Sequence, residues 1–246
     1  MRIAVITGAS YGIGRSISET LLREGWKVYG LSRSRPSMAD EHFVWLKCDL
    51  SQAEQITECL QKIEESTIDV VVSNAGVIEI EKASAVSKIS YEKTFSVNVL
   101  APMLVVNALH SKIASATIVS ISSVSDRIPE ADVALYCSSK AANTVYFNAL
   151  ADELKDARVY TLLPDYVDTP MQHRTNDDNE DFDWSAIIKP DDVAMLVRDL
   201  IAAVVSVESG SNIIIVTEKL KEDLKSIEKL YGFNTNTNEL IRLSVA

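Results

Sequence analysis

The chain has 246 residues, of which 47% are hydrophobic, and a formal net charge of −11 at pH 7. The hydrophobic share suffices for a sizeable core, whereas the acidic balance argues against binding to nucleic acid or to an anionic membrane surface. The cysteines, Cys48, Cys59 and Cys137, have no paired spacing, which argues against a disulfide scaffold and fits free thiols in a reducing cytoplasm.

Short β-branched runs recur along the chain. The first ends at Thr7, too early for the core of a signal peptide, and no later segment is expected to span a membrane, which needs about 20 apolar residues. The runs predict strands at residues 3–6, 27–31, 43–47, 69–73, 117–121, 159–163 and 212–216. Their nearly continuous apolar character is typical of parallel strands that are buried on both faces.

Amphipathic segments between the strands predict helices at residues 12–24, 51–65, 88–112, 131–155 and 190–207. Ser51 begins the second of them with Glu54 three residues later, which is a capping-box pattern. The alternation predicts an α/β fold: a Rossmann-type doubly wound sheet of about seven parallel strands with helices on both faces. We expect one domain over residues 1–246, with a substrate loop at 171–188 and a C-terminal helical extension at 219–246.

The first strand runs into a glycine-rich turn, TGASYGIG at residues 7–14, ahead of the first predicted helix. Glycine lets the backbone approach a phosphate where a side chain would block it, and the N-terminus of the helix offers unpaired N–H groups. The GxxxGxG spacing departs from the general GxGxxG fingerprint, but three of the eight glycines fall in this turn. The turn therefore predicts a dinucleotide site, with a purely structural turn as the alternative.

The end of the second strand bears on the choice of dinucleotide. An acidic residue about 20 positions beyond the glycines binds a ribose hydroxyl of NAD, whereas an arginine accommodates the additional phosphate of NADP. The sequence there reads LSRSR, without a carboxylate, and Arg33 is the best candidate, with Arg35 and Arg15 as possible helpers. NADP, as NADPH, is therefore the predicted cofactor and NAD the less favoured one. A solvated basic loop is the alternative.

Tyr136 and Lys140 lie four residues apart in the predicted helix 131–155, and so share one face about one turn apart. A neighbouring ammonium lowers the pKa of a phenol, which makes the pair a candidate general acid and base. The spacing by itself also fits a solvated helix surface. Ser123 follows the fifth predicted strand and residues 73–76 end the fourth, at the sheet edge where open parallel sheets bind ligands.

Together these motifs resemble the short-chain dehydrogenase/reductase family, in its smaller single-domain branch, from Arg2 to about Val216. The matching elements are the turn 7–14, Cys48-Asp49-Leu50, Asn74-Ala75-Gly76, Asn98, Ser123, Tyr136 with Lys140, and Pro164 through Thr169. The resemblance implies an NADPH-dependent oxidoreductase that reduces a small ketone, aldehyde or diketone to an alcohol by hydride transfer. The alternatives are an NAD-dependent alcohol dehydrogenase and a non-catalytic dinucleotide-sensing protein on the same fold.

The resemblance also implies roles for individual residues. Tyr136 would exchange a proton with the substrate oxygen, Lys140 would lower the pKa of the tyrosine, and Ser123 would orient the carbonyl. Asn98 would anchor a chain of water molecules, although an amide bonded inside the helix is its alternative. The implied cofactor-binding residues are Gly8, Ser10, Tyr11, Gly12, Ile13, Gly14, Arg33, Asp49, Leu50, Asn74, Ala75, Gly76, Tyr136, Lys140, Pro164, Val167 and Thr169. No metal ligand is predicted.

Three positions depart from the family pattern. Ser73 replaces the first residue of Asn-Asn-Ala-Gly, Asp165 stands where the family has glycine, and the last strand lacks its usual glycines and runs into Thr217. The expected homo-oligomer is accordingly a dimer or a tetramer. In the substrate loop, Phe182 and Trp184 either line the pocket or form a surface cluster. Anionic substrates would be disfavoured by its carboxylates, Asp177, Asp178, Glu180, Asp181 and Asp183.

Overall fold

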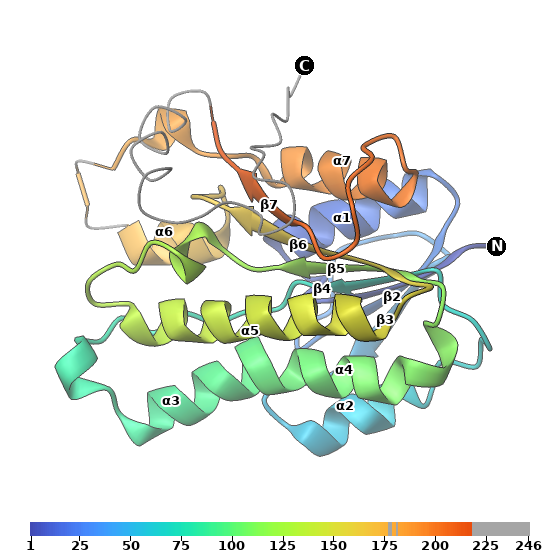
Figure 1. The fold of residues 1–246 in the computed structure, drawn as a ribbon, viewed down its shortest axis with the longest axis horizontal. Coiled ribbons are helices and arrows are strands. Elements are labelled where there is room, and N and C mark those ends of the chain that lie inside the picture. Colours follow the sequence, from blue (N-terminus) through green and yellow to red (C-terminus); the bar gives the residue numbers. More distant parts are fainter. Residues whose placement is uncertain (177–178, 181, 218–246) are drawn as a thin grey trace.

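The computed structural model describes residues 1–176, 179–180 and 182–217, and its centre is a sheet of seven parallel strands (Figure 1). The strand order is β3-β2-β1-β4-β5-β6-β7, so the chain changes direction between β1 and β4, where doubly wound sheets bind ligands. The strands are β1 (Ile3–Thr7), β2 (Lys27–Ser32), β3 (Phe43–Lys47), β4 (Val70–Ser73), β5 (Thr117–Ile121), β6 (Arg158–Pro164) and β7 (Asn212–Ile215). All seven predicted strands are confirmed, each end to within one residue.

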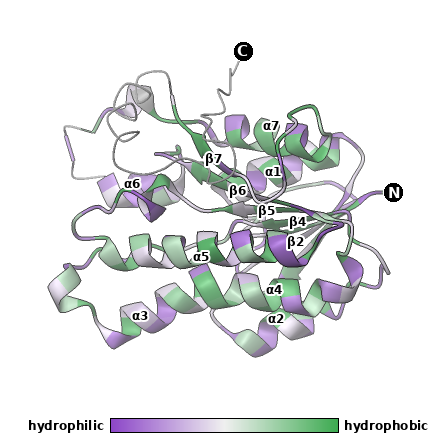
Figure 2. Cartoon of the chain, viewed as in Figure 1, coloured by the Kyte–Doolittle hydropathy of each residue, from purple (hydrophilic) through white to green (hydrophobic). Residues whose placement is uncertain are grey.

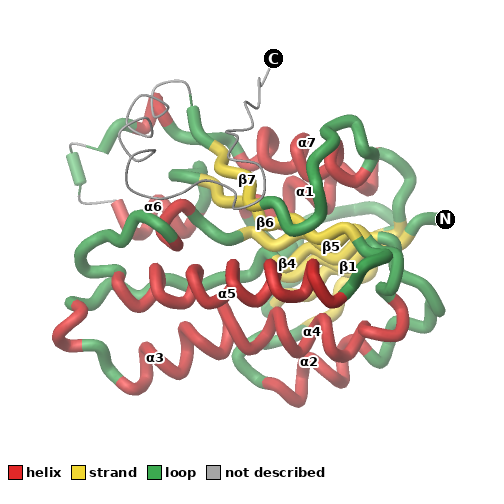
Figure 3. Tube along the Cα trace, in the orientation of Figure 1, coloured by secondary structure: helices red, strands yellow, loops and turns green. Residues whose placement is uncertain are grey.

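Helices cover both faces of the sheet. They are α1 (Gly12–Arg23), α2 (Ala53–Leu60), α3 (Lys88–Phe95), α4 (Ala101–Leu109), α5 (Ala134–Glu153), α6 (Pro170–Asn176) and α7 (Pro190–Ile201). Helices α1 and α7 pack together on one face, and α2, α4 and α5 lie on the other (Figures 1 and 3). The predicted Rossmann-type architecture is therefore confirmed.

The core divides into two layers because successive side chains of a strand point to opposite faces. On the α4 side, Val5 belongs to the same buried cluster as Ile118. On the opposite side, Ile6 joins Ile17 of α1 and Val197 of α7. Figure 2 shows the resulting pattern, with apolar strands between helices whose surfaces carry polar patches. This burial on both faces explains why the strands could be recognised from unbroken apolar runs.

The predicted helix 88–112 is helical throughout, but a π-helical turn at Ser96–Leu100 separates α3 from α4. Pro102 has no N–H, so the carbonyl of Asn98 lacks its usual i→i+4 donor. The side-chain amide of Asn143 on α5 donates to that carbonyl instead, at 3.0 Å. The proline was the local signal for this irregularity, and the sequence analysis missed it.

Contrary to the expectation of no span, Lys88–Lys112 is long and apolar enough by composition to cross a membrane. In the fold this segment is a core helix, since Val105 and Leu109 are buried beneath the sheet with Phe147 of α5. A buried core helix and a membrane-spanning helix meet the same criteria of length and composition. Here the packing shows that burial in the core accounts for the apolar composition of the segment.

Two local predictions are wrong. Helix α2 begins at Ala53 with Gln52 as its N-cap, so Ser51 does not cap it; the Ser51 hydroxyl donates to Asp49 Oδ1 at 2.8 Å. The substrate loop contains a helix, α6, that weak periodicity did not indicate. The predicted C-terminal extension, 219–246, lies outside the described residues.

Candidate functional site

A cleft of about 860 Å³ follows the carboxyl ends of the strands. Its walls come from the turn after β1, the ends of β2 and β4, the segment between β5 and α5, and the segment from β6 through α6. The predicted site residues that line it are Gly8, Ser10, Tyr11, Gly12, Ile13, Arg33, Asp49, Leu50, Asn74, Ala75, Gly76, Ser123, Tyr136, Lys140, Pro164, Val167 and Thr169. Gly14 and Asn98 lie behind this surface.

The glycine turn is closely packed from behind. Gly8 and Gly12 have φ angles of +71° and +54°, which side chains rarely adopt. A Cβ on Gly12 would lie 2.8 Å from Thr169 Cγ2. A Cβ on Gly14 would lie 2.4 Å from both the Gly8 carbonyl oxygen and Asn74 Nδ2. Because glycine has no side chain, a ligand in the cleft can lie directly against the backbone of the turn and the N-terminus of α1. This arrangement fits the pyrophosphate of a dinucleotide.

Thr7 and Asn74 tie together the ends of β1 and β4. The Thr7 hydroxyl accepts from the backbone N–H groups of Asn74 at 3.0 Å and Ala75 at 3.1 Å. The Asn74 side chain donates back to the Thr7 carbonyl at 2.9 Å. These bonds fix the floor of the cleft at the switch point. The sequence analysis included Thr7 only as part of the turn and gave it no role.

Arg33 lies directly after β2, is exposed and lines the cleft beside Asp49. Burial acts to raise the pKa of Asp49, but hydrogen bonds from Ser51 and the charge of Arg33 outweigh it and lower the pKa. The other two arginines are not brought into the site. Arg15 pairs with Glu19 at 2.7 Å, and Arg35 lies over the Trp45 ring, 5.9 Å from its centroid.

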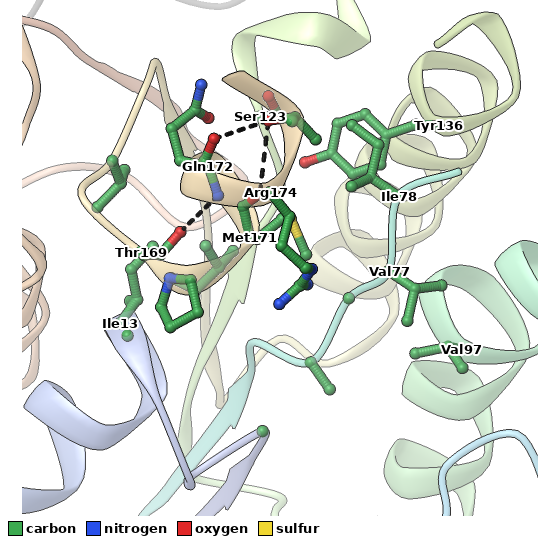
Figure 4. A pocket seen from close by; sticks show the side chains of 18 of the residues that line it. Ile13, Val77, Ile78, Val97, Ser123, Tyr136, Thr169, Met171, Gln172 and Arg174 are labelled. Carbon is green, nitrogen blue, oxygen red and sulfur yellow. Dashed lines mark hydrogen bonds between the residues drawn. The ribbon is translucent and has the colours of Figure 1, made fainter. Parts of the chain in front are cut away.

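Ser123, Tyr136 and Lys140 converge where β5 meets α5. Ser123 lies close enough to the Tyr136 side chain to act on its pKa, in the lowering direction. Lys140 Nζ lies 5.6 Å from the centre of the tyrosine ring and donates to the Ile121 carbonyl at 2.9 Å. Figure 4 shows the Tyr136 hydroxyl pointing into the cleft, toward the helix that carries Arg174. The structure therefore brings together the three residues that the spacing suggested.

The predicted effect of Lys140 on the tyrosine stays a prediction, because burial is the largest influence on the pKa of Tyr136 in this structure. Burial raises the pKa of Tyr136 to about 12, the charge of Glu130 adds to the rise, and the hydrogen bond from Ser123 offsets only part of it. Burial also lowers the pKa of Lys140 to about 8, against the opposing charge of Asp126. Desolvation therefore dominates both groups, and the phenol is held in its protonated form at neutral pH.

The Asn98 side chain is bonded to two other segments of the chain, and not inside its own helix as in the alternative considered for it. Its side chain accepts from Val77 N at 2.8 Å and donates to Val77 O and to Ser139 Oγ, both at 2.9 Å. A Cβ on Gly76 would lie 3.5 Å from Asn98 Oδ1 and 3.6 Å from Lys140 Nζ. Asn98 thus holds the loop after β4 against α5, next to Lys140.

Asp126 is a buried carboxylate that the sequence analysis missed. Its side chain is 2% exposed, accepts from Thr144 Oγ1 at 2.7 Å and pairs with Arg127 at 3.4 Å. Burial raises its pKa to about 6, although the Thr144 hydrogen bond and the charges of Arg127 and Lys140 pull it downward. Only the tertiary structure places this group near Lys140.

The raised pKa of Asp126 predicts a pH-dependent stability. Between about pH 4 and pH 6 the folded state holds a proton that the unfolded chain releases near 3.8, so the stability from this group falls as pH rises from about 4 through about 6. At about 1.4 kcal/mol per pKa unit, wild type should lose about 2–3 kcal/mol of unfolding free energy relative to Asp126→Asn across that range. Denaturant titrations at several pH values measure it, with the exposed Asp156→Asn as the control. Parallel stability curves for wild type and Asp126→Asn would contradict the burial effect.

The segment 171–188 meets the cleft only in its first part. Met171, Gln172 and Arg174 form part of the wall (Figure 4). Phe182 and Trp184 are not among the lining residues. Trp184 stacks on His173 at 4.4 Å between ring centres and contacts Phe182 at 4.7 Å, which confirms the surface-cluster alternative.

Among the residues that the structure describes, the acidic residues of the cleft are not those of the loop. Glu180 and Asp183 are exposed and do not line it, and Asp177, Asp178 and Asp181 lie outside the described residues. The lining carboxylates are Asp49, Glu130, Asp132 and Asp165. Glu130 and its neighbours Ser125 and Tyr166 were not predicted, because they come from two segments that only the fold brings together, the β5–α5 connection and the chain after β6.

Known proteins resemble this chain in both sequence and fold. A family model described as short chain dehydrogenase matches residues 2–180. An uncharacterized oxidoreductase of Staphylococcus saprophyticus is 31% identical, covering 78% of this chain and 88% of its own. Benzil reductase ((S)-benzoin forming) of Bacillus subtilis is 27% identical, with 70% and 77% covered. The structure of an alcohol dehydrogenase from the archaeon Thermococcus sibiricus, complexed with 5-hydroxy-NADP, matches with a TM-score of 0.77 at 25% identity, covering 89% of this chain and 97% of that one.

Proposed function

Because this chain belongs to the short-chain dehydrogenase/reductase family of NAD(P)-dependent oxidoreductases, we propose that it reduces a small ketone, aldehyde or diketone with NADPH. The observation that carries the proposal is the protonated Tyr136 phenol that points into the cleft, beside Ser123 and close to Lys140. A raised phenol pKa suits a proton donor, as reduction requires. Alcohol oxidation would need the same group as a phenolate.

The dinucleotide would be held by the glycine turn at residues 8–13, by residues 74–76 and by Lys140 and Thr169, all of which line the cleft. When bound, it would supply the hydride. These residues leave the Tyr136 hydroxyl facing the remaining part of the cleft, toward α6 (Figure 4).

The chain's own residues would do the rest. Ser123 would donate a hydrogen bond to the substrate oxygen and so orient the carbonyl, and Tyr136 would deliver a proton to that oxygen. Lys140, whose pKa is about 8, is mostly charged at neutral pH and would stabilise the phenolate left on Tyr136. The related benzil reductase supports a neutral carbonyl as the substrate class.

A panel of neutral aldehydes, ketones and diketones, followed by nicotinamide absorbance, tests this function. We expect NADPH oxidation with at least one neutral carbonyl, and a CoA thioester in the panel tests whether an anionic substrate is disfavoured. NADPH binding without turnover of any member would instead favour a dinucleotide-sensing protein. The cytoplasmic location and the dimer or tetramer expected from the sequence stay predictions.

Arg33 provides a separate test of the NADPH preference. Replacing it with alanine should weaken NADPH binding about tenfold, since a charge-assisted hydrogen bond contributes about 1.5–3 kcal/mol. NADH lacks the additional phosphate, so its affinity should hardly change. Fluorescence titration of both nucleotides measures the effect, with Arg35→Ala as the matched control outside the cleft. Tighter binding of NADH than NADPH by wild type would remove the role given to Arg33.

A further inference from the structure

Three polar side chains join the segment after β5 to α5: Ser122, Asp126 and Thr144, which we call the polar clip. Thr144 Oγ1 lies 2.7 Å from Asp126 Oδ2 and 2.8 Å from Ser122 Oγ. The Ser122 hydroxyl donates to the carbonyl of Lys140 at 3.2 Å, one helical turn before Thr144. Ser122 and Thr144 are buried, and the Asp126 side chain is 2% exposed, so protein groups have replaced water around the clip.

The polar clip is attached to a site residue on each side. Asp126 ends the short helical turn Val124–Asp126, whose N-cap is Ser123, and its backbone N–H donates to the Ser123 carbonyl at 3.1 Å. On α5, Lys140 is held through its own carbonyl by the clip, and its Nζ donates to the Ile121 carbonyl at 2.9 Å. The clip therefore fixes the segment that carries Ser123 against the turn of α5 that carries Lys140.

The hydrogens available to the polar clip depend on the charge of Asp126. A hydroxyl has one hydrogen, so Thr144 donates either to Ser122 or to Asp126 at one time. In the ionised form Thr144 donates to the carboxylate, and Ser122 has one hydrogen for either Thr144 or the Lys140 carbonyl. In the protonated form the carboxyl donates to Thr144, and all three contacts are satisfied. The clip stays closed in both forms, but only the ionised form carries a negative charge.

That charge acts on Lys140. Burial lowers the pKa of Lys140 to about 8, and the charge of Asp126 acts against this fall. Among the residues that the structure describes, the charged groups that act on Asp126 are Arg127, whose Nε lies 3.4 Å from its Oδ1, and Lys140 itself. An ammonium that lost the support of this carboxylate would deprotonate at a lower pH.

We propose that Asp126 and Thr144 are positioning residues for carbonyl reduction: they hold Ser123 in place against α5, and the Asp126 carboxylate keeps Lys140 charged. Neither side chain lines the cleft, so both act through the residues that do. The inference rests on the proposed function, because the placement of Ser123 and the charge of Lys140 affect turnover only if the cleft binds a carbonyl. A clip that served stability alone would affect neither.

Thr144→Val tests the hydrogen bonds of the clip, because valine keeps the shape of threonine but has no hydroxyl. We expect kcat to fall about tenfold, within the about 10²-fold that a misplacement of about 1 Å can cost, while the Kd for NADPH stays close to wild type. Thr144→Ser keeps the hydroxyl and should recover most of the wild-type kcat. Thr94→Val is the matched control, because Thr94 is also buried and outside the cleft, and its hydroxyl has no hydrogen-bond partner within the part of the chain that the structure describes.

Asp126→Asn tests the charge separately, because asparagine can still accept from Thr144 but is neutral. The decline of kcat at high pH, which reports loss of the Lys140 ammonium, should shift to lower pH by at least about 0.5 unit, since a nearby opposite charge shifts a pKa by about 1–3 units. Below about pH 5, where Asp126 of wild type is itself protonated, the two proteins should have similar kcat. The exposed Asp156→Asn is the control and should leave the profile unchanged.

The outcomes distinguish the clip from the function on which it rests. An active wild type with unchanged kcat in Thr144→Val would overturn the positioning role and leave the reductase standing. An equal loss in Thr94→Val, or no recovery in Thr144→Ser, would overturn it as well, since general damage to the core explains both. An unshifted high-pH limb in Asp126→Asn would overturn the role of the carboxylate charge. No turnover by wild type on any carbonyl would overturn both proposals.

Discussion

Tyr136→Phe should reduce carbonyl turnover by about 10²–10⁴-fold, the contribution of a positioned general acid, while NADPH binding stays close to wild type. The substitution removes only the hydroxyl, so the ring that lies against Lys140 Nζ remains. The hydroxyl points into the cleft. Without it, the substrate oxygen has no buried acid at hand. Steady-state kinetics and fluorescence titration of the nucleotide together measure this result.

Tyr146→Phe is the matched control, because Tyr146 lies on the same helix, is half-buried and does not line the cleft. It should keep wild-type rates. Tyr166 is another tyrosine that lines the cleft, and its bond to Glu130 makes it a rival donor worth comparing. Near-wild-type turnover by Tyr136→Phe would contradict the assignment, and loss of turnover in Tyr166→Phe alone would transfer the role to that residue.

Gly14→Ala should weaken dinucleotide binding at least about tenfold, equivalent to about 1.4 kcal/mol, and lower the thermal stability. Gly14 lies in α1, where alanine is intrinsically the better helix former by about 1 kcal/mol, so any loss must come from the collision. The added Cβ would lie 2.4 Å from the Gly8 carbonyl oxygen, a backbone atom that cannot rotate away. The turn that faces the phosphates must therefore shift. Overpacking of this kind costs about 1–3 kcal/mol.

Ser16→Ala in the same helix is the control, since it also replaces a residue with a better helix former but lies outside the cleft. Nucleotide titration and thermal unfolding of both variants measure the difference. Unchanged NADPH affinity in Gly14→Ala would show that the position of the turn does not govern cofactor binding. A gain in melting temperature for both variants would show that the close contact relaxes without cost.

The sheet was predictable from the sequence because each strand carries its own local signature. A run such as residues 70–72 is apolar at every position, since both of its faces are covered by helices. Parallel topology then places the ends of β1, β4 and β5 at one edge, so motifs far apart in the chain could be assigned to one cleft. For this reason the glycine turn, Asn74, Ser123 and Tyr136 all lie where the sequence analysis expected them.

Local geometry was less predictable where one segment depends on another. The π-helical turn near Asn98 follows from Pro102, but its carbonyl is satisfied by Asn143, which is 45 positions further along the chain. The capping pattern at Ser51 was sound as a local rule, yet Asp49 takes the hydroxyl. At Asn98 a side chain from another helix replaces the missing backbone donor, and at Ser51 a nearby carboxylate accepts the hydroxyl. Spacing along the chain does not reveal either partner.

The sequence by itself determined the fold and the members of the Ser123, Tyr136 and Lys140 set, because hydrophobic periodicity and motif spacing are properties of adjacent residues. Only the tertiary structure decided the protonation of Tyr136 and the connection from Ser125 to Glu130. Both depend on how far a group is removed from water and on which distant groups replace that water. Desolvation is a property of the surrounding packed chain, so the four-residue spacing predicted the neighbour of the phenol but not the direction of its pKa.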